Sequence, residues 1–243
     1  MKPSASEQDK KRLQVFLSHS GLCSRRKAMD LILEGHVHVN GNIVCEPSEP
    51  VNEHDKILLD GIEVSAQKFE YIMLNKPKGY ITTLEDRHAP HKVTELLPAD
   101  YRHLYPAGRL DKDTEGLLLF TNDGETAFRL THPRFNVDKT YFVKIKSHLA
   151  PKDKTRLEKG IMVGGKITAP AKISSLRIEG NLTYFHLTIH EGRKRQIRYM
   201  LAKLRYFIVE LKRVSQGPLK LGDLKTGAWR RLTAQEIAQL RKI

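Results

Sequence analysis

Apolar residues near the start of the chain first follow a helical spacing twice and then alternate with polar residues. The helical spacing predicts one short helix that Gly21 closes, and a second helix that Ser24 caps and Gly35 ends. Two hairpins are predicted next, because the pairs Asn40-Gly41 and Asp60-Gly61 are typical of tight turns between strands. The apolar faces of the two helices are Leu13, Phe16 and Leu17, and then Ala28, Leu31 and Ile32.

The pattern changes after a short polar linker at residues 65–70. Beyond it, short apolar runs bounded by turn residues alternate with helical stretches, without a regular repeat of strand, helix and strand. This order favours an α+β fold with a mixed, mainly antiparallel sheet over a doubly wound parallel one. We therefore expect a flexible tail at residues 1–10, a small module at 11–68 and a larger domain at 69–243.

One stretch of the larger domain, residues 107–124, joins a charged turn to a strongly apolar run. Its sequence is AGRLDKDTEGLLLFTNDG, and the apolar part, 117–120, predicts a short buried strand. Such a strand needs no acidic residues at its start for stability, whereas a fold can use a rigid buried element to position a reactive side chain. Asp111 is the first candidate for that role, because a carboxylate can attack an electrophilic carbon.

Two other interpretations of Asp111 remain open at this point. An aspartate in a turn commonly caps that turn with its side chain. The spacing of Asp111, Asp113 and Glu115 also imitates the opening of a calcium-binding loop, but Asn122 replaces the glutamate of the twelfth position, and apolar residues fill positions seven to ten. A calcium site is therefore not expected, and no other metal is expected either.

Basic residues are concentrated towards the C-terminus. The chain has a net charge of +14, yet residues 11–70 hold 7 Lys and Arg against 9 Asp and Glu, while residues 190–243 hold 14 against 4. This concentration of one sign favours a polyanionic partner. Lys194, Arg195 and Arg198 are expected on one helix face, where they would suit a phosphate backbone; a merely solvated face usually mixes charges of both signs.

A second basic cluster, Arg25, Arg26 and Lys27, occupies the first turn of the helix that follows Ser24. The helix dipole disfavours cations there by roughly 0.3–1 kcal/mol each. These side chains are therefore either directed at phosphates together with the free N–H groups, or simply solvated. The residues alone leave both interpretations open.

The remaining features of the sequence bear on location, cofactors and oligomeric state. Cys23 and Cys45 form neither a metal-ligand spacing nor a disulfide framework, which favours a reducing, cytoplasmic location. No apolar run approaches the roughly 18 residues of a membrane span, and the N-terminal residues lack the apolar core of a signal peptide. Neither G-x-G-x-x-G nor a Walker sequence is present, so no nucleotide cofactor is expected. Without a heptad pattern, we expect a monomer.

The stretch 107–124 resembles the catalytic signature of the RNA pseudouridine synthases, in the branch that modifies ribosomal RNA. The resemblance implies that Asp111 is the nucleophile and that Arg109 fills the space left by the expelled nucleotide. It also implies that Tyr141 stacks on the target base, with a possible second role as proton acceptor. Arg198 would form an ion pair with the catalytic aspartate and keep it oriented.

Two further segments share this resemblance. Residues 11–70 resemble the alpha-L RNA-binding module of a small-subunit ribosomal protein, and Asn75–Gly79 matches the first motif of the synthases, beside the active site. The residues expected to contact RNA are Arg25, Arg26, Lys27, Lys76, Arg109, Arg193, Lys194 and Arg195.

The function implied is the isomerisation of a uridine in ribosomal RNA to pseudouridine, without a cofactor, on a nucleotide flipped out of its helix. The large subunit is the expected target, with the small subunit as the alternative, and the partner is free ribosomal RNA or an assembly intermediate. A non-catalytic ribosome-assembly factor is the rival from another class, since binding would need only the N-terminal module and the basic C-terminal part. The residues do not select between attack on the pyrimidine ring and action at the ribose.

Overall fold

The computed structural model describes residues 10–52, 54–65, 68–84 and 90–243. The chain divides into two compact units, Met1–Phe69 and Glu70–Ile243, and each is described by itself. The tail predicted at residues 1–10 lies outside the described residues, apart from Lys10. Among the described residues, no helix combines the length and apolar character that crossing a membrane requires.

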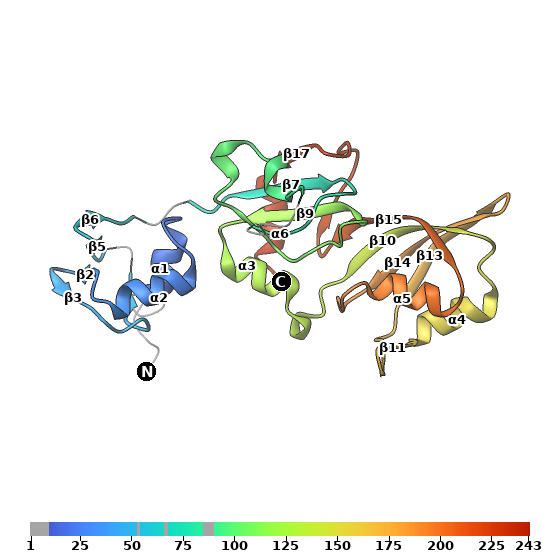
Figure 1. The fold of residues 1–243 in the computed structure, drawn as a ribbon, viewed down its shortest axis with the longest axis horizontal. Helices are drawn as coiled ribbons and strands as arrows, with labels where there is room; N and C mark the ends of the chain where they lie inside the picture. The colour runs from blue at the N-terminus through green and yellow to red at the C-terminus, as the bar shows by residue number, and fades with distance from the viewer. Residues whose placement is uncertain (1–9, 53, 66–67, 85–89) are drawn as a thin grey trace. The chain divides into compact units, whose positions relative to one another are not determined.

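The N-terminal unit contains the two helices and two hairpins predicted from the sequence (Figure 1). Ser24 caps the second helix by accepting a hydrogen bond from the backbone N–H of Lys27, at 3.3 Å. At each hairpin turn both residues have positive φ, 52° and 88° at Asn40-Gly41 and 50° and 80° at Asp60-Gly61, as this tight turn requires. The elements are β1 (Lys11–Arg12), α1 (Leu13–His19), α2 (Arg25–Leu33), β2 (Val37–Val39), β3 (Asn42–Ile43), β4 (Pro50–Val51), β5 (Ile57–Leu59) and β6 (Ile62–Glu63).

The larger unit is built on one twisted sheet, with the strand order β13-β14-β10-β15-β9-β7-β17 among the described residues, β16 pairing with β15 and β8 with β9. Its pairs are antiparallel except for β9 with β15, so the expected α+β fold with a mixed, mainly antiparallel sheet is confirmed. The strands are β7 (Tyr71–Lys76), β8 (Tyr105–Pro106), β9 (Glu115–Thr121), β10 (Lys139–Lys146), β13 (Lys172–Glu179), β14 (Leu182–Ile189), β15 (Phe207–Gln216), β16 (Leu219–Lys220) and β17 (Trp229–Arg231).

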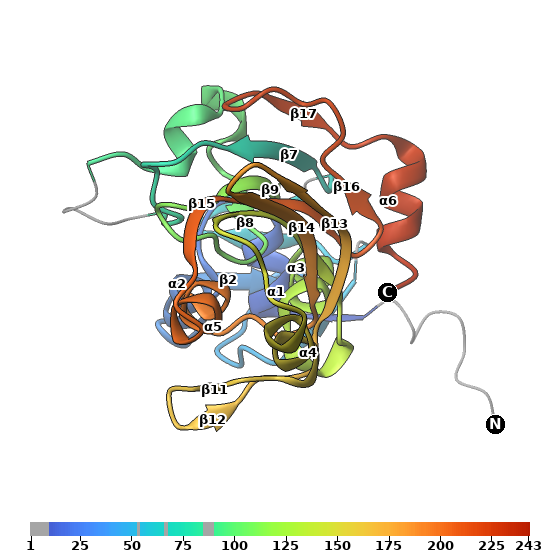
Figure 2. The ribbon, with the colours of Figure 1, turned by 90° about the vertical axis from the view of Figure 1, so that its right-hand side faces the viewer.

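Helices cover one face of the sheet where β10 and β14 pair. Alternate residues of these strands, such as Val143 and Leu187, are buried against Leu157 of α4 and Leu201 of α5, and Figures 1 and 2 show both helices on the same side of the strands. A small hairpin, β11 (Met162–Val163) and β12 (Lys166–Ile167), lies outside the sheet. The helices are α3 (Gly124–Thr131), α4 (Pro151–Lys159), α5 (Gln196–Lys203) and α6 (Ala234–Leu240), with single 3-10 turns at Val93–Leu96, Ala99–Tyr101 and Pro133–Phe135.

The parallel contact between β9 and β15 depends on one glycine. Gly116 lies opposite Arg213 in the register and has a φ of 107°. A Cβ atom at this position would come within 2.2 Å of the Arg213 carbonyl oxygen. Only a residue without a side chain therefore lets the two strands approach, and this approach joins the two halves of the sheet.

We predict that Gly116→Ala lowers the free energy of unfolding by about 2–4 kcal/mol, because it combines backbone strain with a backbone clash. Gly222→Ala is the matched control, since Gly222 also has a positive φ, 58°, but has open space around it. The control should cost about 1 kcal/mol. Urea unfolding of both variants checks the difference, and equal losses would contradict the role assigned to the close approach.

Candidate active site

A cavity of about 780 Å³ lies on the larger unit, between the loop that precedes β9 and the segment that precedes α5. Arg109, Asp111, Tyr141 and Arg198 all line it, although they are far apart in the sequence. The fold thus brings together the four residues to which the resemblance assigned catalytic or space-filling roles. Arg109 is exposed at its surface, whereas Tyr141, at the start of β10, is 8% exposed and also contacts the core.

The loop that carries Asp111 is fixed mainly through its backbone carbonyl groups. The Nζ of Lys76 donates to the carbonyl oxygens of Asp111 at 3.2 Å, Lys112 at 3.3 Å and Thr114 at 2.9 Å, and also to that of Pro77 at 3.0 Å. One ammonium group therefore holds three carbonyl groups of the same turn. Because these partners are backbone atoms, they constrain the position of the main chain at Asp111 directly.

Neighbouring groups complete this attachment. The hydroxyl of Thr82 donates to the carbonyl of Leu110 at 2.9 Å and accepts from its N–H at 3.2 Å. The backbone N–H of Gly79 donates to the carbonyl of Lys112 at 2.9 Å. Arg198 donates to the carbonyl of Asp113, as described below. Each backbone carbonyl from residue 110 to residue 114 therefore accepts a hydrogen bond from a residue outside this segment. The carboxylate of Asp111 is therefore carried by a rigid main chain.

Lys76 corrects one expectation from the sequence. It was predicted to contact RNA, but its side chain is fully buried and its donors are directed at the loop carbonyls. Burial lowers the pKa of Lys76 from 10.5 to about 8, and the carboxylates of Asp113, Glu115 and Asp111 oppose that shift. Lys76 is the last residue of strand β7, and all six residues of this strand are buried.

Arg198 also differs from the expectation. Its Nη2 donates to the carbonyl oxygen of Asp113 at 2.8 Å and to the hydroxyl of Thr114 at 3.3 Å. Among the described residues, the Asp111 carboxylate forms no ion pair within 4 Å, so the predicted pair with Arg198 is absent from this structure. Burial and the nearby Arg195 lower the pKa of Arg198. The Nε of this guanidinium is buried, and no described residue forms a hydrogen bond with it.

Two buried cations that the sequence analysis missed lie at the same cavity. Arg213 is 2% exposed and donates from Nε to the carbonyl of Leu117 at 2.8 Å. Lys139 is 8% exposed and donates to the carbonyls of Val137 and His190, at 3.1 and 3.4 Å. Burial, and after it the charge of Arg213, lowers the pKa of Lys139. The alternation of Leu211 and Arg213 along β15 was the signal in the sequence that Arg213 faces inward.

The basic segment before α5 forms a turn rather than a helix face. Helix α5 begins at Gln196, and Arg195 precedes it with a φ of 55°, so Lys194, Arg195 and Arg198 do not share the predicted helical stripe. Arg195 instead lies 3.7 Å from the carboxylate of Asp113, and Lys194 is exposed. The prediction was wrong because the periodicity of the following apolar residues was extended across the turn.

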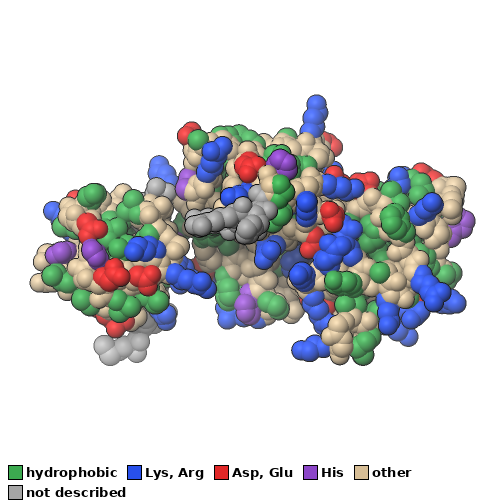
Figure 3. Space-filling view, in the orientation of Figure 1, with side chains coloured by type: hydrophobic (Ala, Val, Ile, Leu, Met, Phe, Trp, Pro, Cys, Tyr) green, Lys and Arg blue, Asp and Glu red, His purple; other side chains and the backbone are tan. Residues whose placement is uncertain are grey.

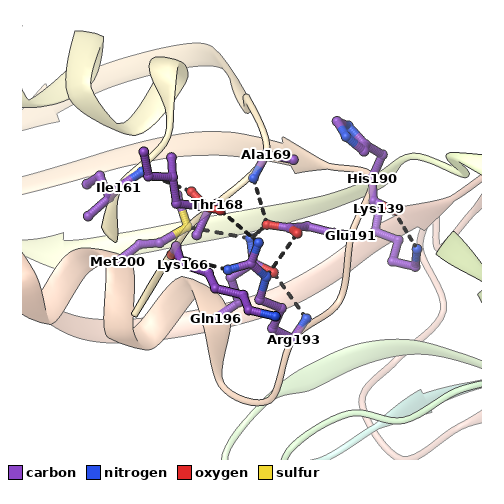
Figure 4. Close-up of polar contacts among 11 residues, drawn as sticks. Lys139, Ile161, Lys166, Thr168, Ala169, His190, Glu191, Arg193, Gln196 and Met200 are labelled. Carbon is purple, nitrogen blue, oxygen red and sulfur yellow. Dashed lines mark hydrogen bonds and ion pairs between the residues drawn. The ribbon is translucent and has the colours of Figure 1, made fainter. Parts of the chain in front are cut away.

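Glu191 organises this turn, as Figure 4 shows. Its Oε1 accepts from the backbone N–H of Ala169 at 2.9 Å and from Nε2 of Gln196 at 2.6 Å. Its Oε2 accepts from Nε of Arg193 at 3.1 Å. The same guanidinium donates to the carbonyl groups of Lys166 and Ile167, so Arg193 ties the turn to the hairpin and has a structural role in addition to the predicted contact with RNA.

The remaining predicted RNA contacts lie in the N-terminal unit. Arg25, Arg26 and Lys27 are exposed at the start of α2 and flank the N–H groups of its first turn. Within the described residues, no group of three or more His, Cys, Asp and Glu side chains could hold a metal ion.

Comparison with known proteins defines the class. The sequence matches the family "RNA pseudouridylate synthase" over residues 70–203 and the S4 domain over residues 11–57. The chain belongs to the RNA pseudouridine synthases, and it is therefore an isomerase that acts on RNA and carries an N-terminal S4 domain.

Particular relatives cover nearly the whole chain. It is 42% identical to ribosomal large subunit pseudouridine synthase B of Bacillus subtilis, over 96% of each chain. An uncharacterized RNA pseudouridine synthase of Aquifex aeolicus is also 42% identical, over 95% of this chain and 94% of the other. A crystal structure of a pseudouridylate synthase is similar with a TM-score of 0.67 and 32% identity, over 94% of this chain and 99% of the other.

We predict that Lys76→Met lowers kcat about 10- to 100-fold, because the Asp111 loop loses its shared donor and misplacement of a reacting group is costly. RNA affinity should change less than about twofold, since the side chain is buried. Lys78→Met, two residues away and exposed, is the matched control and should keep kcat while weakening binding. Single-turnover kinetics and RNA-binding titrations separate the two; a variant Lys76→Met that loses affinity alone would contradict the structural role.

A second prediction concerns pH. Because folding lowers the pKa of Lys76 from 10.5 to about 8, the unfolded chain retains this proton between those values and the folded chain does not. This group therefore makes the free energy of unfolding rise with pH across the window, by at most about 1.4 kcal/mol per pH unit. Urea unfolding at pH 7.5, 8.5 and 9.5 should show this rise in the wild type relative to Lys76→Met, and parallel pH profiles would show that the proton is not linked to folding.

Proposed function

We propose that this protein converts one uridine of ribosomal RNA, in the large subunit, to pseudouridine, with Asp111 as the nucleophile. The similarity to the large-subunit enzyme of Bacillus subtilis supports the substrate class. The observation that carries the assignment of Asp111 is the contrast between its main chain, held at 110–114, and its carboxylate, which lines the cavity without an ion pair among the described residues.

The reaction rearranges bonds within one nucleotide. The bond from the ribose C1′ to N1 of uracil breaks, the base rotates, and C1′ bonds to C5. The hydrogen on C5 leaves as a proton and N1 gains a proton, so no electrons are gained or lost overall. A carboxylate can serve by adding to the pyrimidine ring or by acting at C1′ of the ribose, and in both cases its bond to the nucleotide is transient.

The cavity residues supply the surroundings that this chemistry needs. The ring of Tyr141 offers a surface on which the rotated-out uracil can stack, which contributes about 1–3 kcal/mol per base. Arg109 is exposed and lines the cavity, and in this proposal it fills the gap that the expelled nucleotide leaves. The buried cations Lys139 and Arg213 line the cavity and give it a positive charge that attracts the phosphates of RNA.

The N-terminal unit contributes affinity in this proposal. Arg25, Arg26 and Lys27 surround the positive end of helix α2, and their exposed charges can reach phosphate groups without disturbing the core. Such contacts position the RNA but do not select a base.

We predict that Asp111→Asn abolishes turnover while RNA affinity stays within a few-fold. Asp113→Asn is the matched control, because Asp113 is an exposed carboxylate of the same loop. Its ion-pair partner among the described residues is Arg195, at 3.7 Å, and the variant should keep most of the activity. The measurement is tritium release from uracil-5-labelled transcripts of large-subunit and small-subunit ribosomal RNA, tested separately.

Each outcome has a distinct meaning. Release from the large-subunit transcript alone, lost in Asp111→Asn, supports the whole proposal. Release from the small-subunit transcript alone would overturn the choice of subunit, and residual turnover by Asp111→Asn would overturn the nucleophile. Tight binding without release from either transcript would favour an assembly intermediate as substrate, or the rival role in assembly.

A further prediction tests the basic turn of α2. Replacing Arg25, Arg26 and Lys27 together by Ala should reduce the slope of log affinity against log salt by about 2–3, because each phosphate contact releases counterions. The three side chains are exposed, and their removal relieves an unfavourable interaction with the helix dipole, so the variant should unfold at a temperature no lower than that of the wild type. An unchanged salt slope in the folded variant would show that this turn is merely solvated.

A further inference from the structure

A second cavity, of about 690 Å³, lies between the β11–β12 hairpin and helix α5. Met162 of the hairpin and Tyr199 of the helix contribute its large apolar surfaces, and both are substantially exposed, at 50% and 48%. The charged residues around these two are all cations, Lys166, Arg193, Lys194 and Lys203. We call this cavity the Tyr199 groove.

The composition of the groove matches a nucleotide better than another macromolecule. An exposed aromatic ring offers a surface for a base, and lysines around it offer partners for the adjoining phosphates. Residues 190–205 contain six Lys and Arg against one carboxylate, Glu191, which is engaged by its own neighbours. Figure 3 shows Lys and Arg side chains gathered over this part of the unit.

The groove is joined to the active site and its wall is firmly held. Arg193 and Lys194 line both cavities, so an RNA strand that leaves one can enter the other. The Nη atoms of Arg193 donate to the carbonyls of Lys166 at 3.3 Å and Ile167 at 2.8 Å, which fixes the hairpin against the turn before α5 (Figure 4). A preformed wall binds a base without the cost of ordering a loop.

We propose that the Tyr199 groove binds an unpaired nucleotide of the substrate RNA that neighbours the target uridine, with its base stacked on Tyr199 and its phosphates near Lys166 and Lys203. This inference rests on the proposed function for the identity of the RNA. It adds a site for a second base, separate from the place of the target uracil at Tyr141.

The first test compares Tyr199→Ala with Tyr199→Phe, and with Phe207→Ala as a control. Phe207 is an exposed aromatic residue, at 70%, that does not line the groove. With the large-subunit transcript as substrate, Tyr199→Ala should raise KM by roughly 5- to 100-fold, the range expected for one stacked base, and leave kcat unchanged. Tyr199→Phe and Phe207→Ala should resemble the wild type, and an unchanged KM in Tyr199→Ala would overturn the proposal.

The second test does not depend on turnover. Fluorescence anisotropy measures the binding of labelled hexauridylate and of a hexamer with the same ribose-phosphate backbone but without bases. Tyr199→Ala should weaken hexauridylate binding and leave the abasic hexamer unaffected, because only the base stacks. If Tyr199→Ala weakens the binding of both probes equally, or of neither, the proposal is overturned. The apolar surface of the Tyr199 groove would then be a candidate site for a protein partner.

The two tests separate the two proposals. A wild type that releases no tritium from either transcript would count against the proposed function, while the hexamer comparison would still decide whether the groove binds a base. A wild type that turns over the large-subunit transcript, with Tyr199→Ala unchanged in KM and in both hexamer affinities, would leave the proposed function intact and refute the groove alone.

Discussion

The ammonium of Lys76, buried without exposure to solvent, is the interaction on which the active site depends. A charge in that environment is costly unless polar groups surround it, and here the polar groups are carbonyls of the Asp111 loop. The requirement works in both directions: the ammonium needs the carbonyls, and the carbonyls of the turn need a donor. Strand β7 carries Lys76 and strand β9 follows the loop, so their pairing sets the distance between the two partners.

The Asp111 loop has a fixed backbone, but the Asp111 carboxylate forms no ion pair among the described residues. Arg198 and Thr82 bind the backbone of the loop, and among the described residues the Asp111 side chain has no charged partner within 4 Å. Under the proposed function, a carboxylate whose main chain is already fixed would lose little entropy on reaction and would keep its oxygen atoms for the substrate. The Nε of Arg198 is buried and has no hydrogen-bond partner among the described residues.

The charges of the larger unit are arranged at two depths. The buried cations Lys139 and Arg213 line the cavity, and the buried Lys76 lies behind the Asp111 loop; all three act over short distances in a medium of low polarity. Exposed cations on the turn before α5 act through water and are screened by salt. Under the proposed function, the first group would act on the nucleotide in the cavity, and the second would attract the RNA backbone. Within the turn, Glu191 engages Arg193, whereas Lys194 is exposed.

Local patterns in the sequence predicted the helices and hairpin turns of the N-terminal unit and the buried strand that follows the charged turn in residues 107–124. Helical spacing, glycine turns and a buried strand are all properties of neighbouring residues. The tertiary structure decided the partners. The contact of Lys76 with Asp111 spans 35 positions and that of Arg198 with Asp113 spans 85, so neither is encoded in any local window. A lysine that follows an apolar run is usually predicted at the surface, but the sheet buries Lys76. Arg198 was expected to pair with the carboxylate of Asp111, but it donates to the backbone carbonyl of Asp113 instead. Side-chain chemistry is local, whereas the hydrogen-bond partner of a buried group depends on which distant segments the core brings together.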